Sequence, residues 1–188
     1  MITCSSTLAL YSDILCFVLC ALCLAGTKYK ALSSKLKIYK MRIAIAADHA
    51  GYPLNERVIA ELSKGGHELT DFGTHNGSTA DDYPDYAKAV GEAIQEGSVD
   101  IGILICGSGV GAAVAASKMH GIRAALCGDT YSARQSREHD DCNVLCLGAR
   151  VVGVELALEI VRAFVAARFT GEERHRRRLA KIEAMENL

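Results

Sequence analysis

The sequence predicts a doubly wound α/β domain, in which helices cover both faces of a five-stranded, Rossmann-like parallel sheet. Two observations support this fold class. After Met41, short apolar or β-branched runs alternate with longer segments of helical spacing. Runs such as 43–46 and 101–105 are apolar on both faces, which is typical of a parallel sheet buried beneath helices on each side. A length of 188 residues suits one such domain.

The strands are expected where the short apolar runs end in Gly, Asp or His, at 42–47, 68–72, 100–105, 123–127 and 143–147. Helices are expected in the intervals and after the last strand, at 52–63, 84–95, 111–118, 131–138 and 154–169. Pro84 stands at the first position of the second helix, where proline is favoured. The alternation of the two element types indicates parallel strands joined by helical crossovers.

One more helical segment is expected at 172–188. Leu179, Ile182 and Met185 form a weak apolar stripe along it. This stripe has no evident packing site within one subunit, so we expect the C-terminal helix to dock on a partner subunit.

Residues 1–40 differ in composition from the rest of the chain. The uncharged run 14–26 is followed by five lysines, and Asp13 is the one acidic residue of the segment. A signal peptide would carry its positive charge before the apolar run, and a spanning helix needs about 20 apolar residues. We therefore expect 1–40 to be a leader or extension outside the fold, 41–188 to be the functional domain, and no membrane partner.

Charge and cysteine spacing exclude several classes of function. The formal net charge of −1 gives no general reason to expect nucleic acid as a partner. Four of the eight cysteines lie within 1–40, and the other four lack C-x-x-C spacing and an adjoining histidine pair. Neither zinc nor a disulfide framework is expected. We interpret the chain as a reduced, cytoplasmic protein in which Cys127, Cys142 and Cys146 are small core residues.

The segment 106–111, Cys-Gly-Ser-Gly-Val-Gly, lies between the third strand and the following helix. Ligands of doubly wound sheets bind beyond the carboxyl ends of the strands, where strand order reverses. Alternating glycines allow backbone N–H groups to turn inward, and a helix start adds further donors. The segment therefore predicts a thiol that acts as nucleophile or base beside an anion site.

Two further pairs of polar residues adjoin predicted strands. Asp48 and His49 follow the first strand, where charged groups are costly unless they point into a cleft. Alternatively, Asp48 is the N-cap of the helix that begins near Tyr52. His139 and Asp140 precede the fifth strand, and two histidines at sheet ends alongside a cysteine favour a site there.

Arg174 and Arg178 are spaced i, i+4, so one helix face could present both to a phosphate. A solvated basic helix is the alternative, and nucleic acid binding is disfavoured because few aromatic residues lie nearby. Tyr83, directly before Pro84, is expected at the rim of the site.

Two other readings of the glycine segment are rejected. Gly107, Gly109 and Ala112 fit a permissive dinucleotide fingerprint, but the motif follows the third strand and leaves no second domain for hydride chemistry. A low-molecular-weight phosphatase needs arginine six residues after its cysteine, and Ala112 occupies that position. No cofactor and no metal are expected.

Taken together, the motifs resemble the type B ribose-5-phosphate isomerases and the related galactose-6-phosphate isomerase subunits. The resemblance covers essentially all of 41–185. It is carried, in this order, by ADHAG (47–51), DYP (82–84), ICGSGVG (105–111), ASK (116–118), GIRA (121–124), YS (131–132), NV (143–144), GARVVGVE (148–155) and ERH (173–175).

The resemblance implies a metal-free aldose–ketose isomerase that acts through an enediolate, as a homodimer or homotetramer with its site at a subunit interface. By the same resemblance, Cys106 is the base, His139 opens the sugar ring, and Ser108 helps hold the enediolate oxygens. The implied substrate-binding residues are Asp48, His49, Tyr83, Gly107, Ser108, Gly109, Val110, Gly111, Asp140, Arg150, Arg174 and Arg178.

Two positions distinguish this chain within the family pattern. The position of Asp140 is commonly asparagine, and Ala112 replaces the glutamate that one branch uses as base. Ribose 5-phosphate is the expected substrate, and the alternatives are a hexose 6-phosphate (allose or galactose) isomerase or a non-catalytic sugar-phosphate-binding subunit. The size of the sugar is expected to depend on the loop 73–82.

Overall fold

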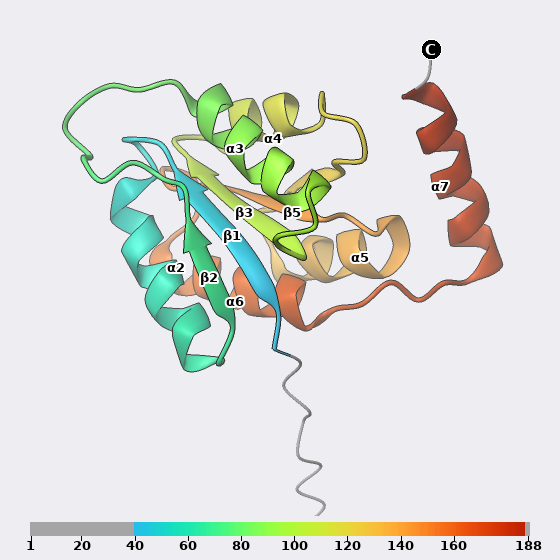
Figure 1. Cartoon of the computed structure of the whole chain (residues 1–188). Coiled ribbons are helices and arrows are strands. Elements are labelled where there is room, and N and C mark those ends of the chain that lie inside the picture. Colours follow the sequence, from blue (N-terminus) through green and yellow to red (C-terminus); the bar gives the residue numbers. More distant parts are fainter. Residues whose placement is uncertain (1–39, 187–188) are drawn as a thin grey trace, which may run out of the picture. The chain divides into compact units, whose positions relative to one another are not determined.

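The computed structural model describes residues 40–186, and their sheet confirms the predicted fold class (Figure 1). All strand pairs are parallel and the strand order is β2-β1-β3-β5-β4. The strands are β1 (Arg42–Ala47), β2 (Glu68–Asp71), β3 (Ile101–Cys106), β4 (Ala124–Leu126) and β5 (Val144–Gly148). The helices are α2 (Tyr52–Lys64), α3 (Tyr83–Gln95), α4 (Val110–Ala116), α5 (Thr130–Asp140), α6 (Val154–Ala166) and α7 (Glu173–Met185).

Several helix ends differ from the predicted bounds by one to three residues, and two of these differences affect which residues lie in a helix near the predicted site. The helix expected at 154–169 ends at Ala166, because the backbone of Ala167 is extended and Arg168 donates to the carbonyl oxygens of Val165 and Ala167. Conversely, α5 continues to Asp140, so His139 and Asp140 belong to the last turn of a helix. Asp141, with a left-handed φ of 45°, ends that helix.

The core forms two layers, one on each face of the sheet. Side chains alternate along a strand, so Ile43 and Ile45 of β1 face one layer and Ala44 and Ala46 face the other. The first layer packs against α2 and α6, and the second against α3 and α4 (Figure 1). β3 is buried over its whole length, as the apolar run 101–105 predicts.

The order of strands reverses between β1 and β3, and the loop after β1 folds over the end of β3 at this point. The N–H of Asp48 donates to the carbonyl of Ile105 at 3.2 Å. Gly51 lies so close that a Cβ placed on it would be 2.2 Å from the Ile105 oxygen. The fold therefore brings the residues after β1 directly beside Cys106.

The C-terminal helix α7 follows an extended segment, beyond the end of α5 (Figure 1). His175 and Leu179 of α7 are buried, whereas Ile182 and Met185 are 42% and 67% exposed. The expectation that the whole stripe lacks a packing site in its own subunit is therefore wrong for Leu179. Docking of α7 on a partner remains a prediction.

No helix within residues 40–186 is both long enough and apolar enough to cross a bilayer.

Replacement of Gly51 by alanine is expected to destabilise the domain by about 1–3 kcal/mol, because the added methyl group must displace the backbone of β3 or of its own loop. Gly128→Ala is the matched control, since a Cβ there meets no atom within 4 Å. Urea unfolding of the two variants and the native chain measures the difference. Equal midpoints for both variants would contradict the close approach.

Candidate functional site

The thiol of Cys106 lies at the carboxyl end of β3, where the glycine segment begins. Its side chain is buried, with 4% of the residue exposed, and the N–H of Gly109 donates to Sγ at 3.1 Å. Gly109 has a φ of 80°, and a Cβ there would be 2.4 Å from Leu126 Cδ1. Only glycine fits this turn without strain, and the turn aims a backbone donor at the sulfur.

The backbone after Cys106 offers further donors. Gly109 is the N-cap residue of α4 and has no side chain to satisfy the first-turn N–H groups. The Ser108 hydroxyl accepts from the N–H of Val110 at 3.3 Å, and it retains its own proton for donation. This set of donors beside a thiol can hold an oxyanion, as the sequence predicts.

Four other predicted site residues gather at this edge of the sheet: Asp48, His49, Tyr83 and Arg150. Asp48 is 5% exposed, and its Oδ1 accepts the Gly51 N–H at 2.8 Å. The N-cap of α2 is Gly51 itself, so the alternative role of Asp48 as that N-cap is wrong. A Cβ placed on Gly107 would lie 3.6 Å from Arg150 Cζ, and one placed on Gly111 would lie 2.6 Å from Tyr83 Cζ. Arg150 and Tyr83 therefore flank the two ends of the glycine segment.

A hollow of about 410 Å³ opens between the loop after β1 and the loop after β5. It is of the size that small ligands occupy. Two of its lining side chains, His49 and Arg150, carry nitrogen donors, and most of the others are apolar. The lining residues are His49, Ala50, Pro53, Leu54, Gly77, Ala149, Arg150, Val152 and Val154.

Asp81, which the sequence analysis missed, holds His49 at this hollow. Its Oδ1 accepts from the His49 backbone N–H at 2.9 Å and contacts the ring Nδ1 at 2.7 Å. The Tyr86 hydroxyl donates to Oδ2 at 2.7 Å. Burial acts to raise the pKa of Asp81, but the hydrogen bonds from His49 and Tyr86 outweigh it and lower the pKa to about 2.

No sequence pattern singles Asp81 out, because an aspartate two residues before a helix reads as part of a capping turn. Its partners are 32 residues earlier and five residues later in the chain.

His139 and Asp140 do not lie alongside Cys106 within the chain, contrary to expectation. α5 leads from the carboxyl end of β4 to the amino end of β5, so its last turn lies at the amino edge of the sheet. Cys106 pairs in register with Gly148, at the other end of β5 from Val144. Val144 and Gly148 are four positions apart along β5, which separates the two ends by about 13 Å.

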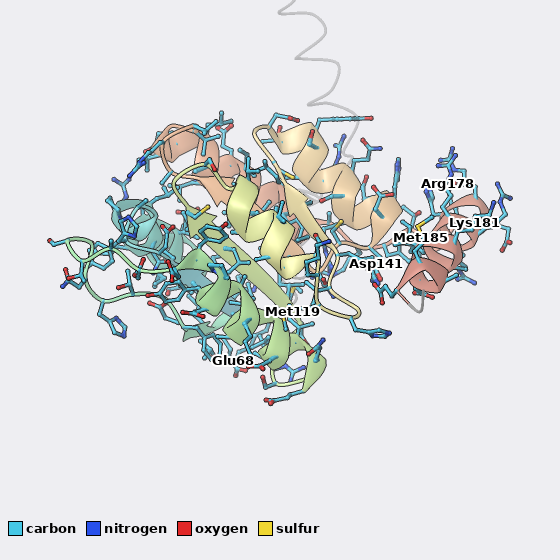
Figure 2. All side chains as sticks on the ribbon, turned by 90° about the horizontal axis from the view of Figure 1, so that it is seen from above. Glu68, Met119, Asp141, Arg178, Lys181 and Met185 are labelled. Atoms are coloured by element: carbon cyan, nitrogen blue, oxygen red, sulfur yellow. The ribbon has the colours of Figure 1, made fainter. Side chains whose placement is uncertain are left out.

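A second group of residues forms at the amino edge. The His139 ring stacks on that of His175, with centroids 4.2 Å apart and planes 21° from parallel. Burial, followed by the nearby charges of His139 and Arg174, lowers the pKa of His175. Figure 2 shows Arg178, Lys181 and Met185 along α7, with Asp141 on the neighbouring end of the domain.

A second hollow, of about 490 Å³, lies between α7 and this edge; Asp140, Cys142, Ile182 and Met185 are among its lining residues. Arg174 Nε donates to Oε2 of Glu172, the N-cap residue of α7, at 2.8 Å. The structure thus gathers the predicted residues into two groups, with Cys106, Ser108, Asp48, His49, Tyr83 and Arg150 at one edge, and His139, Asp140, Arg174 and Arg178 at or beside the other.

Among the described residues, no three or more His, Cys, Asp or Glu side chains cluster closely enough to hold a metal ion.

The other three cysteines of the described chain are buried free thiols of low reactivity. Burial raises the pKa of Cys127 to about 11 and that of Cys142 to about 12, and it raises the pKa of Cys146 further. None of these sulfurs accepts a backbone N–H among the hydrogen bonds within residues 40–186, which distinguishes them from Cys106.

Iodoacetamide at pH 7.5 is therefore expected to alkylate Cys106 faster than Cys127, Cys142 or Cys146, and a bound sugar phosphate is expected to slow the reaction. Peptide mass spectrometry over time measures each rate in one sample. Labelling of Cys127 at the same rate as Cys106 would contradict the assignment of Cys106 as the reactive thiol.

The chain is similar to known isomerases over almost all of this domain. Residues 43–182 match the family model described as Ribose/Galactose Isomerase. The chain is 48% identical over 145 residues to ribose-5-phosphate isomerase B of Escherichia coli (strain K12), which covers 77% of this chain and 96% of the relative.

Solved structures agree with the sequence match. Ribose-5-phosphate isomerase B of Clostridium thermocellum superposes with a TM-score of 0.76 at 49% identity, covering 78% of this chain and 98% of that one. The Mycoplasma genitalium enzyme, solved with bound ribulose-5-phosphate, gives a TM-score of 0.74 at 40% identity and covers 78% and 96% of the two chains. The structure contains the predicted glycine segment after Cys106, and the similarity extends over almost the whole domain. The chain therefore belongs to the ribose/galactose isomerase family.

Proposed function

We propose that this protein interconverts ribose 5-phosphate and ribulose 5-phosphate through an enediolate, with Cys106 as the base. The observation that carries the proposal is the thiol held in the glycine segment beside a hollow lined by His49 and Arg150. The names of the E. coli and C. thermocellum relatives and the ligand of the M. genitalium structure support this substrate.

The reaction moves one proton between neighbouring carbons. The Cys106 thiolate removes the proton from C2 of the open-chain aldose, and the C–H electrons form the C1–C2 double bond as the carbonyl electrons move to O1. The thiol then returns the proton to C1, while the proton on O2 is lost and O1 gains one, which gives the ketose. N–H groups of the glycine segment and the Ser108 hydroxyl stabilise the enediolate oxygens, and one such donor contributes about 3 kcal/mol.

We further propose that each complete site takes residues from two subunits of a homodimer or of the dimers within a homotetramer. In one chain, Cys106 and His139 lie at opposite edges of the sheet. A two-fold arrangement that places the amino edge and α7 of one subunit against the glycine segment of the other would create two identical sites. His139 would then open the sugar ring, and Asp140 would bind a hydroxyl. Arg174 and Arg178 would bind the phosphate together with His49 and Arg150 of the other subunit.

The residues needed for this chemistry all follow Met41, and the family match lies within 43–182. We therefore propose that 41–188 is the isomerase domain; the expected leader, 1–40, lies outside the described residues except for Lys40. The buried free thiols suit a reducing compartment, so we propose a cytoplasmic location. A chain that begins at Met41 should retain the turnover of the full chain.

Cys106→Ala is expected to lower kcat for ribose 5-phosphate at least 100-fold and to change substrate affinity little, because a proton-transfer base contributes mainly to the transition state. Calorimetry measures binding, and ketose formation measures turnover. Cys127→Ala, which removes another buried thiol, is the control and should retain activity. Residual turnover near the native value in Cys106→Ala would exclude Cys106 as the base.

The same assay separates the alternative functions. Faster turnover of allose 6-phosphate or galactose 6-phosphate than of ribose 5-phosphate would favour a hexose phosphate isomerase. Tight binding of sugar phosphate by the native chain without turnover would favour a non-catalytic subunit.

Mixing Cys106→Ala subunits with His139→Asn subunits is expected to restore up to about a quarter of native sites, because half of the randomly formed dimers are mixed and one of the two sites in each has both residues intact. Subunit exchange is verified by mass spectrometry of the native assembly. Each variant assayed alone is the control. Complete exchange without recovered activity would place His139 outside the partner's site.

A further inference from the structure

We infer that Asp81 is a positioning residue that fixes the ring of His49 and directs Nε2 to the hollow shared with Arg150. The inference rests on the proposed function for the identity of the ligand, a sugar phosphate. Its geometry is independent of that proposal, because it follows from three hydrogen bonds at one carboxylate.

The contacts of Asp81 define which nitrogen of His49 carries a proton. Nδ1 lies 2.7 Å from Asp81 Oδ1 and 3.3 Å from the Asp81 backbone nitrogen. The first contact needs Nδ1 to donate and the second needs it to accept. An ionised carboxylate only accepts, and the contact with it is the shorter, so Nδ1 carries the proton. Nε2 is then the nitrogen left for a ligand, and it has no hydrogen-bond partner within residues 40–186.

Asp81 is itself held firmly. Its Oδ2 accepts the Tyr86 hydroxyl from α3, and Oδ1 accepts the His49 backbone N–H from the loop after β1. With its pKa lowered to about 2, this carboxyl group stays ionised at neutral pH. Burial and the bond to Asp81 also raise the pKa of Tyr86, so the phenol keeps the proton that it donates.

The same carboxylate joins the loop before α3 to the site. The loop also contributes Gly77 to the wall of the hollow, where a Cβ would lie 2.8 Å from Tyr52 Cδ1. Asp81 therefore couples the position of this wall to the orientation of His49. Cys106 and the glycine segment hold their geometry through other contacts, so loss of Asp81 should affect ligand binding rather than proton transfer.

The experiment compares the full native chain with Asp81→Asn, Asp81→Ala and the matched control Asp82→Asn. Asp82 is the adjacent acidic residue; it is exposed, and its side chain makes no capping hydrogen bond to α3. For each protein, we would measure KM and kcat for ribose 5-phosphate, the affinity for inorganic phosphate, and the ring ¹⁵N chemical shifts of His49. His49→Gln identifies the His49 signals.

We expect Asp81→Ala to raise KM and to weaken phosphate binding by about tenfold, the effect of one charge-assisted hydrogen bond. kcat should stay within about twofold, and the ¹⁵N shifts should show loss of the Nδ1–H form. Asp81→Asn keeps the shape and one acceptor oxygen, so its effect should have the same direction and be smaller. Asp82→Asn should match the native chain.

Unchanged His49 shifts in both Asp81 variants would overturn the inference. A fold-decrease in kcat as large as the fold-increase in KM would also overturn it. If Asp81→Ala does not fold, as judged by urea unfolding, Asp81→Asn decides. Failure of the proposed function would be distinguishable, because the native chain would then show no turnover of ribose 5-phosphate. The ¹⁵N shifts of His49 and the affinity for phosphate could still be measured and would still test the role of Asp81.

Discussion

The common direction of the five strands is the constraint on which the arrangement of this protein depends. Each helix that joins two parallel strands must return the chain from the carboxyl edge of the sheet to the amino edge. Cys106 ends a strand and His139 ends a connecting helix, so they lie at opposite edges. A fold of this kind brings strand-end residues together and keeps helix-end residues apart from them. The homodimer that we propose would combine both groups in one site.

Close backbone packing brings three loops together around Cys106 at the carboxyl edge of the sheet. Gly51 lets the loop after β1 lie on the end of β3, and Gly148 lies so near the Ser108 carbonyl that a Cβ would be 2.5 Å from that oxygen. These contacts bring the three loops after β1, β3 and β5 around one thiol. The left-handed turn at Gly109 then directs an N–H to the sulfur. Close packing of these loops suits the proposed enediolate mechanism, because an oxyanion is stabilised most by donors that need no rearrangement.

The two edges of the sheet also differ in the contacts made by their ionisable side chains. At the carboxyl edge, the ionised Asp81 contacts His49, and both His49 and Arg150 line the hollow. At the amino edge, His175 is 1% exposed, neither of its ring nitrogens has a hydrogen-bond partner among residues 40–186, and burial lowers its pKa. The buried His175 ring therefore supports the His139 ring by stacking, and Arg174 is the residue directly before it in α7.

The sequence by itself determined the fold class, the approximate bounds of the eleven helices and strands of residues 40–186, and the central position of Cys106, because hydrophobic periodicity and glycine spacing are local properties of a chain. It also placed Asp48, His49, Tyr83 and Arg150 at one site, with the resemblance as the basis for Arg150. Only the tertiary structure decided that His139 lies at the other edge and that Asp81 clamps His49. Both depend on contacts between residues distant in the chain: the direction of α5 across the sheet sets the first, and a bond that joins positions 32 residues apart sets the second.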